Sequence, residues 1–251
     1  MSADFVLEAF SLRREFKGFV AVRDVNLKIR RGSVHALIGP NGAGKTTVFN
    51  LITKFLKPTS GRIVYDGTDI TAERPAQIAR RGLVRSFQIS ATFPHLTVLQ
   101  NVRVALQRKA GLATQLWLSE RALTRLDGRA RELIEAVNLQ DYLHTEAAEL
   151  SYGRKRALEF ATTLALEPTV LLLDEPMAGM GHEDIDRIAQ LVQQAAAGRT
   201  ILMVEHNLSV VSRICDTISV LQRGEIVAEG DYATVSADPR VREAYLGTEV
   251  V

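Results

Sequence analysis

The sequence predicts an α/β fold with a mixed, largely parallel sheet at its core, an antiparallel flank of strands and a helical insert. The first indication is three apolar runs, at residues 34–38, 170–173 and 201–204, with little alternation between apolar and polar residues. Such runs are typical of strands buried on both faces of a parallel sheet. Helical patterns separate the runs, and residues 89–167 contain helical patterns but no convincing strand.

The individual elements follow from residue type and periodicity. Short β-branched or leucine-rich runs predict strands at residues 6–12, 25–29, 34–38, 62–65, 84–87, 170–173, 201–205, 218–221 and 226–229. Apolar residues at helical spacing predict helices at residues 45–56, 98–107, 120–137, 154–166, 184–196 and 208–214. Asp66-Gly67 and Arg223-Gly224 have the composition of hairpin turns. We therefore expect residues 25–29 and the two hairpins to form the antiparallel flank.

Length and composition indicate one globular domain. The chain has 251 residues, of which 46% are hydrophobic and 24% charged, and these values exclude a disordered or collagen-like chain. A chain of this length forms one domain, or one domain with a subdomain. We expect a single domain over residues 1–251, in which 1–88 and 168–251 form the α/β core and 89–167 form a helical subdomain.

Charge and cysteine content limit the partners and the compartment. Lys and Arg number 31 against 29 Asp and Glu, so the net charge is +2 and gives no reason to expect a nucleic-acid partner. The single cysteine, Cys215, cannot form an internal disulfide, which fits a reducing compartment. The apolar runs are far shorter than the ~20 residues of a membrane-spanning helix. Any place at a membrane is therefore expected to depend on partner proteins.

A glycine-rich motif predicts a phosphate-binding loop. The motif G-x-x-x-x-G-K-[ST] follows the predicted strand 34–38 and opens the predicted helix at residue 45. Its small residues allow consecutive backbone N–H groups to face an anion, Lys45 adds a positive charge, and the Thr46 hydroxyl can coordinate Mg²⁺. Alone, the motif does not separate a kinase, a GTPase and a transport ATPase. The loop and its next residue are Gly39, Pro40, Asn41, Gly42, Ala43, Gly44, Lys45, Thr46 and Thr47.

Two strand ends carry side chains suited to metal and water. The apolar run 170–173 ends in Asp174, which can hold Mg²⁺ through water, and Glu175, which can polarise an attacking water. Gln88 closes the predicted strand 84–87 and offers an amide oxygen to Mg²⁺ or water. Solvent-facing acids and an ordinary polar strand end are the alternative interpretations.

Two further positions suit contact with phosphate. Ser151, Tyr152 and Gly153 stand just before the predicted helix 154–166, where a hydroxyl and backbone amides form an anion site or simply an N-cap. His206 follows the predicted strand 201–205 and can donate a hydrogen bond to a γ-phosphate. A lone histidine at such a place is otherwise an ordinary polar residue.

Taken in order, these motifs resemble those of the ATP-binding cassette (ABC) family: phosphate loop, Q-loop, signature, acidic strand and switch histidine. The resemblance extends from about Phe5 to the C-terminus. It implies the P-loop NTPase fold of ABC ATPases, with ATP and Mg²⁺ bound and ATP hydrolysed. It also implies a second cassette, because family members sandwich two ATP molecules between two cassettes.

The resemblance implies a role for each matching residue. Residues 39–47 bind the phosphates of ATP, while Thr46, Gln88 and Asp174 complete the Mg²⁺ shell. Glu175 is the catalytic carboxylate, assisted by Gln88 and by His206, which senses the γ-phosphate. Phe16 stacks on adenine, or is otherwise ordinary core packing. The signature residues Ser151, Tyr152 and Gly153 reach the nucleotide bound by the second cassette.

The sequence departs from the family pattern at two places. The usual signature is Leu-Ser-Gly-Gly-Gln, whereas Tyr152 replaces the first Gly and Arg154 replaces the Gln. After the acidic strand, Gly181 stands where most members carry an Asp. We expect Ser151 and Gly153 to keep the phosphate contact of the signature.

Finer motifs resemble one branch of the family. Residues 84–88, 93–98, 150–153 and 243–247 are similar to those of ATP-binding subunits of bacterial importers for branched-chain or other hydrophobic amino acids or amides. This similarity implies membrane permease subunits, indirectly a periplasmic binding protein, and a peripheral location on the cytoplasmic face of the inner membrane. The alternatives are the ATPase of a lipid or lipopolysaccharide exporter, which shares the C-terminal motif, and a soluble ABC ATPase.

Overall fold

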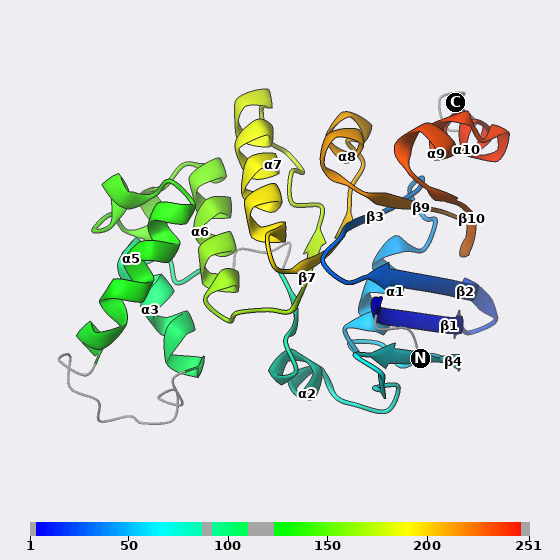
Figure 1. Cartoon of the computed structure of the whole chain (residues 1–251), viewed down its shortest axis with the longest axis horizontal. Coiled ribbons are helices and arrows are strands. Elements are labelled where there is room, and N and C mark those ends of the chain that lie inside the picture. Colours follow the sequence, from blue (N-terminus) through cyan, green and yellow to red (C-terminus); the bar gives the residue numbers. More distant parts are fainter. Residues whose placement is uncertain (1–3, 87–91, 110–122, 247–251) are drawn as a thin grey trace. The chain divides into compact units, whose positions relative to one another are not determined.

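The computed structural model describes residues 4–86, 92–109 and 123–246, which fall into two compact units (Figure 1). We call the first the core unit; it comprises Met1–Arg85, Thr169–Pro176 and Ala196–Val251. The second, the helical unit, comprises Ser86–Pro168 and Met177–Ala195. This grouping differs from the expected division, because residues 177–195 were expected in the core.

A six-stranded sheet forms the centre of the core unit. Its strand order is β10-β9-β3-β8-β7-β6, and all neighbours are parallel except β9 and β10. Every residue of β3, β7 and β8 is buried, which confirms the interpretation of the three apolar runs. The strands are β3 (Val34–Ile38), β6 (Leu83–Arg85), β7 (Val170–Asp174), β8 (Thr200–Val204), β9 (Thr217–Gln222) and β10 (Glu225–Gly230).

A second, antiparallel sheet has the order β2-β1-β4-β5. Its first hairpin is longer than predicted, because β1 runs over Phe5–Phe16 and β2 over Phe19–Arg30. Irregular pairing and the positive φ of Ser11 (45°) and Asp24 (49°) interrupt the period of two that a regular strand shows. The other strands are β4 (Ser60–Tyr65) and β5 (Thr68–Asp69).

Both predicted hairpin turns are confirmed. Asp66 and Gly67 have φ values of 48° and 74°, and Arg223 and Gly224 have 49° and 85°, as a type I′ turn requires at its two central residues. The placement of the second hairpin was wrong, however. The β9–β10 hairpin extends the six-stranded sheet instead of joining the antiparallel flank, because β9 pairs in parallel with β3.

The helices of the core unit were predicted only in part. Helix α1 ends at Ile52 and not at residue 56, because the Thr53 hydroxyl donates to the carbonyl of Phe49 (2.6 Å) and Lys54 turns to a φ of 65°. Three short helices were missed, including α9, whose N-terminus the Asp231 carboxylate caps. The helices are α1 (Lys45–Ile52), α2 (Pro75–Arg80), α8 (Leu208–Ile214), α9 (Tyr232–Ala237) and α10 (Pro239–Leu246).

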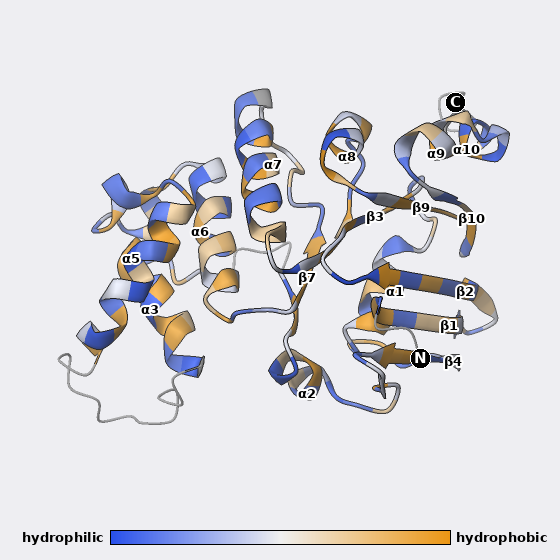
Figure 2. Cartoon of the chain, viewed as in Figure 1, coloured by the Kyte–Doolittle hydropathy of each residue, from blue (hydrophilic) through white to orange (hydrophobic). Residues whose placement is uncertain are grey.

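In the helical unit, α3 (Val98–Lys109), α5 (Asp127–Ala136) and α6 (Tyr152–Leu164) pack against one another (Figure 1). Most of α7 (His182–Ala196) also belongs to this unit, and Figure 2 shows both polar and apolar bands along it. Short 3₁₀ turns lie at Thr124–Leu126, Gln140–Tyr142 and Ala147–Glu149. The predicted start of the helix 120–137 lies outside the described residues.

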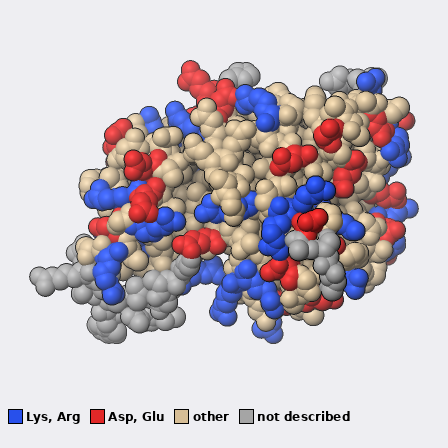
Figure 3. Space-filling view, in the orientation of Figure 1, with Lys and Arg blue, Asp and Glu red and all other residues tan. Residues whose placement is uncertain are grey.

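The described surface carries both signs of charge. In Figure 3 the Lys and Arg side chains are interspersed with Asp and Glu across the visible face, as the net charge of +2 suggests. Among the described residues, every helix is too short or too polar to cross a lipid bilayer.

The buried imidazole of His35 links three strands of the six-stranded sheet. This side chain of β3 is 1% exposed, and its Nε2–H donates to the hydroxyl of Ser219 on β9 at 2.8 Å. That hydroxyl in turn donates to the carboxylate of Glu229 on β10 at 2.5 Å. Burial lowers the pKa of His35 to about 4, because the imidazolium would lose its hydration. His35 is therefore neutral in the folded protein at neutral pH.

We predict that His35 weakens the fold in acid. The pKa of His35 in the folded protein lies below the unfolded value of 6.5. The stability that depends on the neutral imidazole is therefore complete above pH 6.5 and is lost as the pH falls toward 4. Between pH 8 and pH 5, wild type should lose about 2 kcal/mol more unfolding free energy than His35→Asn. Urea unfolding measures this difference. His95→Asn, at an 89% exposed side chain, should follow wild type, and equal losses for His35→Asn and wild type would contradict the prediction.

Candidate nucleotide-binding and catalytic site

The phosphate loop leaves the buried end of β3 and is held by close backbone contacts. Gly39 (φ 151°) and Gly44 (φ 105°) both adopt conformations that other residues avoid. A Cβ at Gly39 would lie 2.1 Å from the Leu221 carbonyl oxygen, and one at Gly44 would lie 2.6 Å from that of Ala21. Both glycines are therefore required by space as well as by backbone conformation. The carbonyl of Ala43 also accepts the N–H of Gly224 at 2.9 Å.

Lys45 folds back over the loop that precedes it. Its side chain is 6% exposed, and Nζ donates to the carbonyls of Gly39 (2.6 Å) and Pro40 (3.0 Å). Burial lowers the pKa of Lys45, while the charges of Glu175 and Asp174 oppose this effect. These electrostatic neighbours place the cation of the loop close to the acidic end of β7. A bound polyphosphate offers Nζ charged acceptors in place of the two carbonyls.

The sheet topology explains why these residues meet. β3, β8 and β7 are parallel neighbours, so their carboxyl ends lie at one edge of the sheet. Lys45 follows β3, Asp174 ends β7 with Glu175 directly after it, and His206 follows β8. Ligands of open α/β sheets bind outside the carboxyl ends of the strands. The fold thus gathers four of the predicted site residues at the edge where a nucleotide is expected.

Asp174 has an arginine partner that the sequence analysis missed. Its side chain is 3% exposed and accepts a hydrogen bond from Nη2 of Arg85, the last residue of β6. Arg85 is also held by Asn50 Oδ1, at 2.6 Å from Nη1, and lies over the ring of Phe49. Arg85 thus neutralises a buried carboxylate beside the phosphate loop. Carboxylate oxygens of Asp174 and the exposed hydroxyl of Thr46 are the hard ligands that Mg²⁺ prefers.

Glu175 and His206 form a hydrogen-bonded pair. His206 Nε2–H donates to Glu175 Oε1 at 2.8 Å, with the two side chains 42% and 24% exposed. The Glu175 backbone is strained at a φ of 47°, and its N–H donates to the carbonyl of Val204. The backbone N–H of His206 donates to the neighbouring Glu205 carboxylate at 3.0 Å. A carboxylate held in this way, open to solvent, can orient a water molecule and accept its proton.

The remaining predicted residues are placed as follows. Phe16 ends β1 and is 38% exposed, with the guanidinium of Arg14 4.5 Å from its ring centre. Ser151, at the N-terminus of α6 in the helical unit, is exposed, and among the described residues its side chain makes no capping hydrogen bond. The N-cap interpretation therefore does not explain it. Gln88 lies outside the described residues.

Both residues that depart from the usual signature, Tyr152 and Arg154, make contacts within the helical unit. The Arg154 guanidinium lies 4.2 Å from the centre of the Tyr142 ring, and the Tyr152 hydroxyl donates to the carbonyl of Ala178 at 3.2 Å. Gly153 is buried. Among the described residues, no group of three or more His, Cys, Asp and Glu is arranged to hold a metal by itself.

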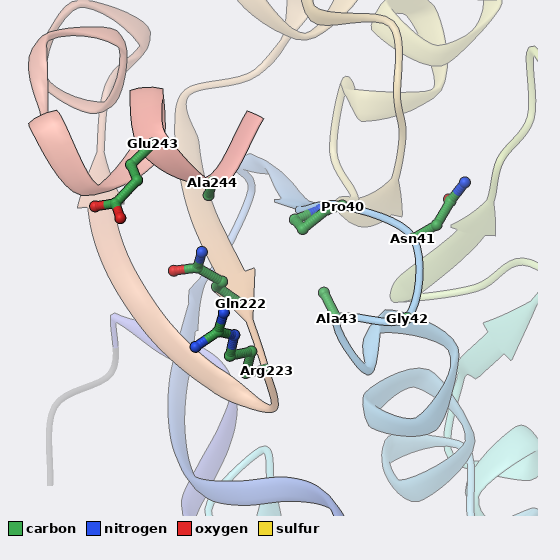
Figure 4. A pocket seen from close by; sticks show the side chains of 8 residues that line it. All are labelled: Pro40, Asn41, Gly42, Ala43, Gln222, Arg223, Glu243 and Ala244. Atoms are coloured by element: carbon green, nitrogen blue, oxygen red, sulfur yellow. The ribbon is translucent and has the colours of Figure 1, made fainter. Parts of the chain in front are cut away.

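A cavity of about 310 Å³ lies on one side of the phosphate loop (Figure 4). The loop forms one wall, and the β9–β10 turn and α10 form the others (Figure 4). This contribution of the C-terminal helix was not predicted, because the one local signal of α10 is the proline at its start. The lining residues are Pro40, Asn41, Gly42, Ala43, Gln222, Arg223, Glu243 and Ala244.

The comparisons with known proteins agree with this geometry. The ABC transporter family model matches residues 22–178, and the model described as branched-chain amino acid ATP-binding cassette transporter matches residues 225–251. The chain is 37% identical over 249 residues to the high-affinity branched-chain amino acid transport ATP-binding proteins BraF of Pseudomonas aeruginosa and LivG of Escherichia coli, covering 96% of this chain and 98% of each relative.

Solved structures show the same fold. The ADP conformation of MJ1267, an ATP-binding cassette of an ABC transporter, superposes with a TM-score of 0.84 at 30% identity, covering 98% of this chain and 100% of that one. A nucleotide-free ATP-binding cassette from an ABC transporter gives a TM-score of 0.83 at 30% identity, covering 96% of this chain and 98% of that one. These matches confirm the predicted fold class. The chain belongs to the ABC transporter family and is an ATP-binding cassette ATPase.

Proposed function

We propose that the chain is the ATP-hydrolysing subunit of an importer for branched-chain or other hydrophobic amino acids or amides. The observation that carries the proposal is the match of residues 225–251 to the branched-chain family model, together with 98% coverage of relatives named for that transport. The same C-terminal segment supplies Glu243 and Ala244 to the cavity beside the phosphate loop.

ATP binding rests on the core unit. The backbone N–H groups of residues 39–47, all except Pro40, surround the phosphates, and Lys45 transfers its hydrogen bonds from the carbonyls of Gly39 and Pro40 to them. Phe16 stacks on the adenine; such stacking contributes about 1–3 kcal/mol per base. Thr46, Gln88 and Asp174 hold Mg²⁺, which neutralises charge on the phosphate oxygens when bound.

Hydrolysis requires Glu175 and His206, and a second protomer. Glu175 orients the attacking water and accepts its proton, while His206 transfers its Nε2–H hydrogen bond from Glu175 to the γ-phosphate. Ser151 and Gly153 belong to the other unit of the chain and engage the nucleotide of a second cassette, identical or related. A dimeric cassette with 25% identity to this chain is among the similar structures. Closure of the pair then makes hydrolysis conditional on assembly.

Partners follow from this role. We place the chain on the cytoplasmic face of the inner membrane, bound to permease subunits that receive substrate from a periplasmic binding protein. Phe93, 52% exposed, offers an apolar contact for a permease helix. Its position is fixed by Asn101, which is 2% exposed, accepts the Phe93 N–H at 2.7 Å and donates to the Phe93 carbonyl at 3.1 Å.

Reconstitution with the membrane subunits tests the proposal. Liposomes that contain the assembled complex and the binding protein should take up labelled leucine, isoleucine or valine only when ATP is supplied on the cassette side. Complexes with Lys45→Ala should show neither uptake nor ATP binding, because the loop then lacks its buried cation. An assembled complex that hydrolyses ATP and moves a lipid, but none of these amino acids, would contradict the importer assignment.

A further inference from the structure

The hydroxyl of Tyr152 connects the start of α6 to the segment that follows the acidic strand. This side chain is 48% exposed, yet its Oη donates to the Ala178 carbonyl at 3.2 Å and accepts from Arg156 Nη2 at 2.9 Å. Ala178 stands three residues after Glu175 in the chain. A glycine, the usual residue at this signature position, has no side chain to make such a link.

Arg156 holds the Tyr152 hydroxyl in place. Positions 152, 156 and 159 lie on one face of a helix, since they are separated by four and three residues. The Arg156 guanidinium lies 5.3 Å from the centre of the Tyr152 ring and donates to Glu159 Oε2 at 2.8 Å. The Arg156 and Glu159 side chains are only 12% and 9% exposed, so this ion pair is largely removed from solvent. The phenol is therefore hydrogen-bonded on both sides.

A second close approach joins the same two segments. A Cβ on Gly153 would lie 2.4 Å from the carboxyl carbon and Oδ1 of Asp184, in the first turn of α7. Any larger residue at position 153 would therefore displace the Asp184 carboxylate from its present place. The start of α6 thus meets the 178–184 segment both at the Tyr152 hydroxyl and at Gly153.

We propose that Tyr152 is a positioning residue that fixes the signature residues 151–153 on the 178–184 segment. The proposal rests on the proposed function, in which Ser151 engages the nucleotide of a second cassette. When Ser151 binds that nucleotide, the Tyr152 hydroxyl fixes the position of the 178–184 segment relative to Ser151. Because this segment follows Glu175 in the chain, the link also constrains the residues that lead from Glu175. The family resemblance implied that Tyr152 reaches the nucleotide of the second cassette. In this proposal it instead links two segments of its own protomer.

Tyr152→Phe tests the proposal, because it removes the hydroxyl and retains the ring beside Arg156. We expect the turnover number of the purified full chain to fall about tenfold, the loss expected when a hydrogen-bonded link of about 1.4 kcal/mol is removed. The ATP concentration at half-maximal rate should change less than about twofold, since no nucleotide contact is lost. When Tyr152→Phe is combined with Glu175→Gln, the affinity of ATP-dependent dimerisation should equal that of Glu175→Gln alone.

Tyr142→Phe is the matched control, because it removes a phenol of the same unit and keeps a ring beneath Arg154. It should turn over at the wild-type rate. All rates are compared well below the thermal midpoints, so unfolding does not contribute. Wild-type turnover in Tyr152→Phe would overturn the proposal. So would a tenfold loss matched by an equal loss of dimer affinity, which would make Tyr152 a nucleotide contact.

The bulky variant Ser151→Phe, measured in parallel, separates this proposal from the proposed function. Loss of activity in Ser151→Phe with full activity in Tyr152→Phe would overturn the positioning role alone. Full activity in Ser151→Phe would remove the shared-site function on which the proposal rests.

Discussion

Replacing Glu175 with glutamine should lower the ATP turnover number by at least about a hundredfold, because a positioned general base contributes about 10²- to 10⁴-fold. The amide keeps the size of the side chain and can still accept a hydrogen bond from His206. It cannot take the proton of the attacking water. ATP binding should persist, since the phosphate loop and Lys45 are unchanged. Size-exclusion chromatography with ATP should then show a long-lived dimer.

The control is Glu225→Gln, which alters a 54% exposed carboxylate of the same unit on strand β10. It should retain the wild-type turnover number, because its ion pair with Arg23 lies in solvent. Steady-state ATPase assays of both variants give the comparison. A Glu175→Gln chain that hydrolyses ATP at the wild-type rate would show that another group activates the water.

Replacing Arg85 with methionine should destabilise the fold by about 3–5 kcal/mol, the usual cost of leaving one partner of a buried ion pair unpaired. Asp174 is 3% exposed, and Arg85 holds it from the adjacent strand β6 while also bonding Asn50 in α1. Without the guanidinium, the buried carboxylate loses its hydrogen-bonded cationic partner. Urea unfolding at neutral pH measures the loss.

Two further variants define this effect. Arg240→Met breaks a more exposed pair with Asp238, with side chains 66% and 19% exposed, and should cost far less than Arg85→Met. Adding Asp174→Asn to Arg85→Met should recover much of the lost stability, because the buried charge is then absent. Equal costs for Arg85→Met and Arg240→Met would contradict the role assigned to the buried pair.

Local patterns predicted the parts of the fold that local chemistry determines. The uninterrupted apolar runs of β3, β7 and β8 identified buried parallel strands, and the glycines of the phosphate loop identified a turn whose space and φ only glycine satisfies. Strands β1 and β2 were underestimated because irregular pairing near Ser11 and Asp24 interrupts their alternation. Helices α9 and α10 are too short to show a clear period.

Sequence motifs predicted the residues of the candidate site but not the contacts between distant residues that hold them. Arg85 and Asp174 are 89 positions apart, and only the pairing of β6 with β7 brings them together. Likewise, the sequence marks Tyr152 as unusual but does not show that its hydroxyl reaches Ala178. Such contacts depend on how distant segments pack, which no short motif specifies. Motifs therefore predicted the candidate residues, and the structure shows the contacts that hold Asp174 and Tyr152.

A mixing experiment tests most directly whether each nucleotide site is built from two protomers. Lys45→Ala removes the phosphate-loop cation, and Ser151→Phe blocks the signature, so each homodimer should be inactive. A mixed dimer contains one intact site, formed by the loop of the Ser151→Phe chain and the signature of the Lys45→Ala chain. At equal amounts, ATPase activity should recover to about a quarter of the wild-type rate, since half of the dimers are mixed. No recovery on mixing, or full activity of Ser151→Phe alone, would contradict the shared site.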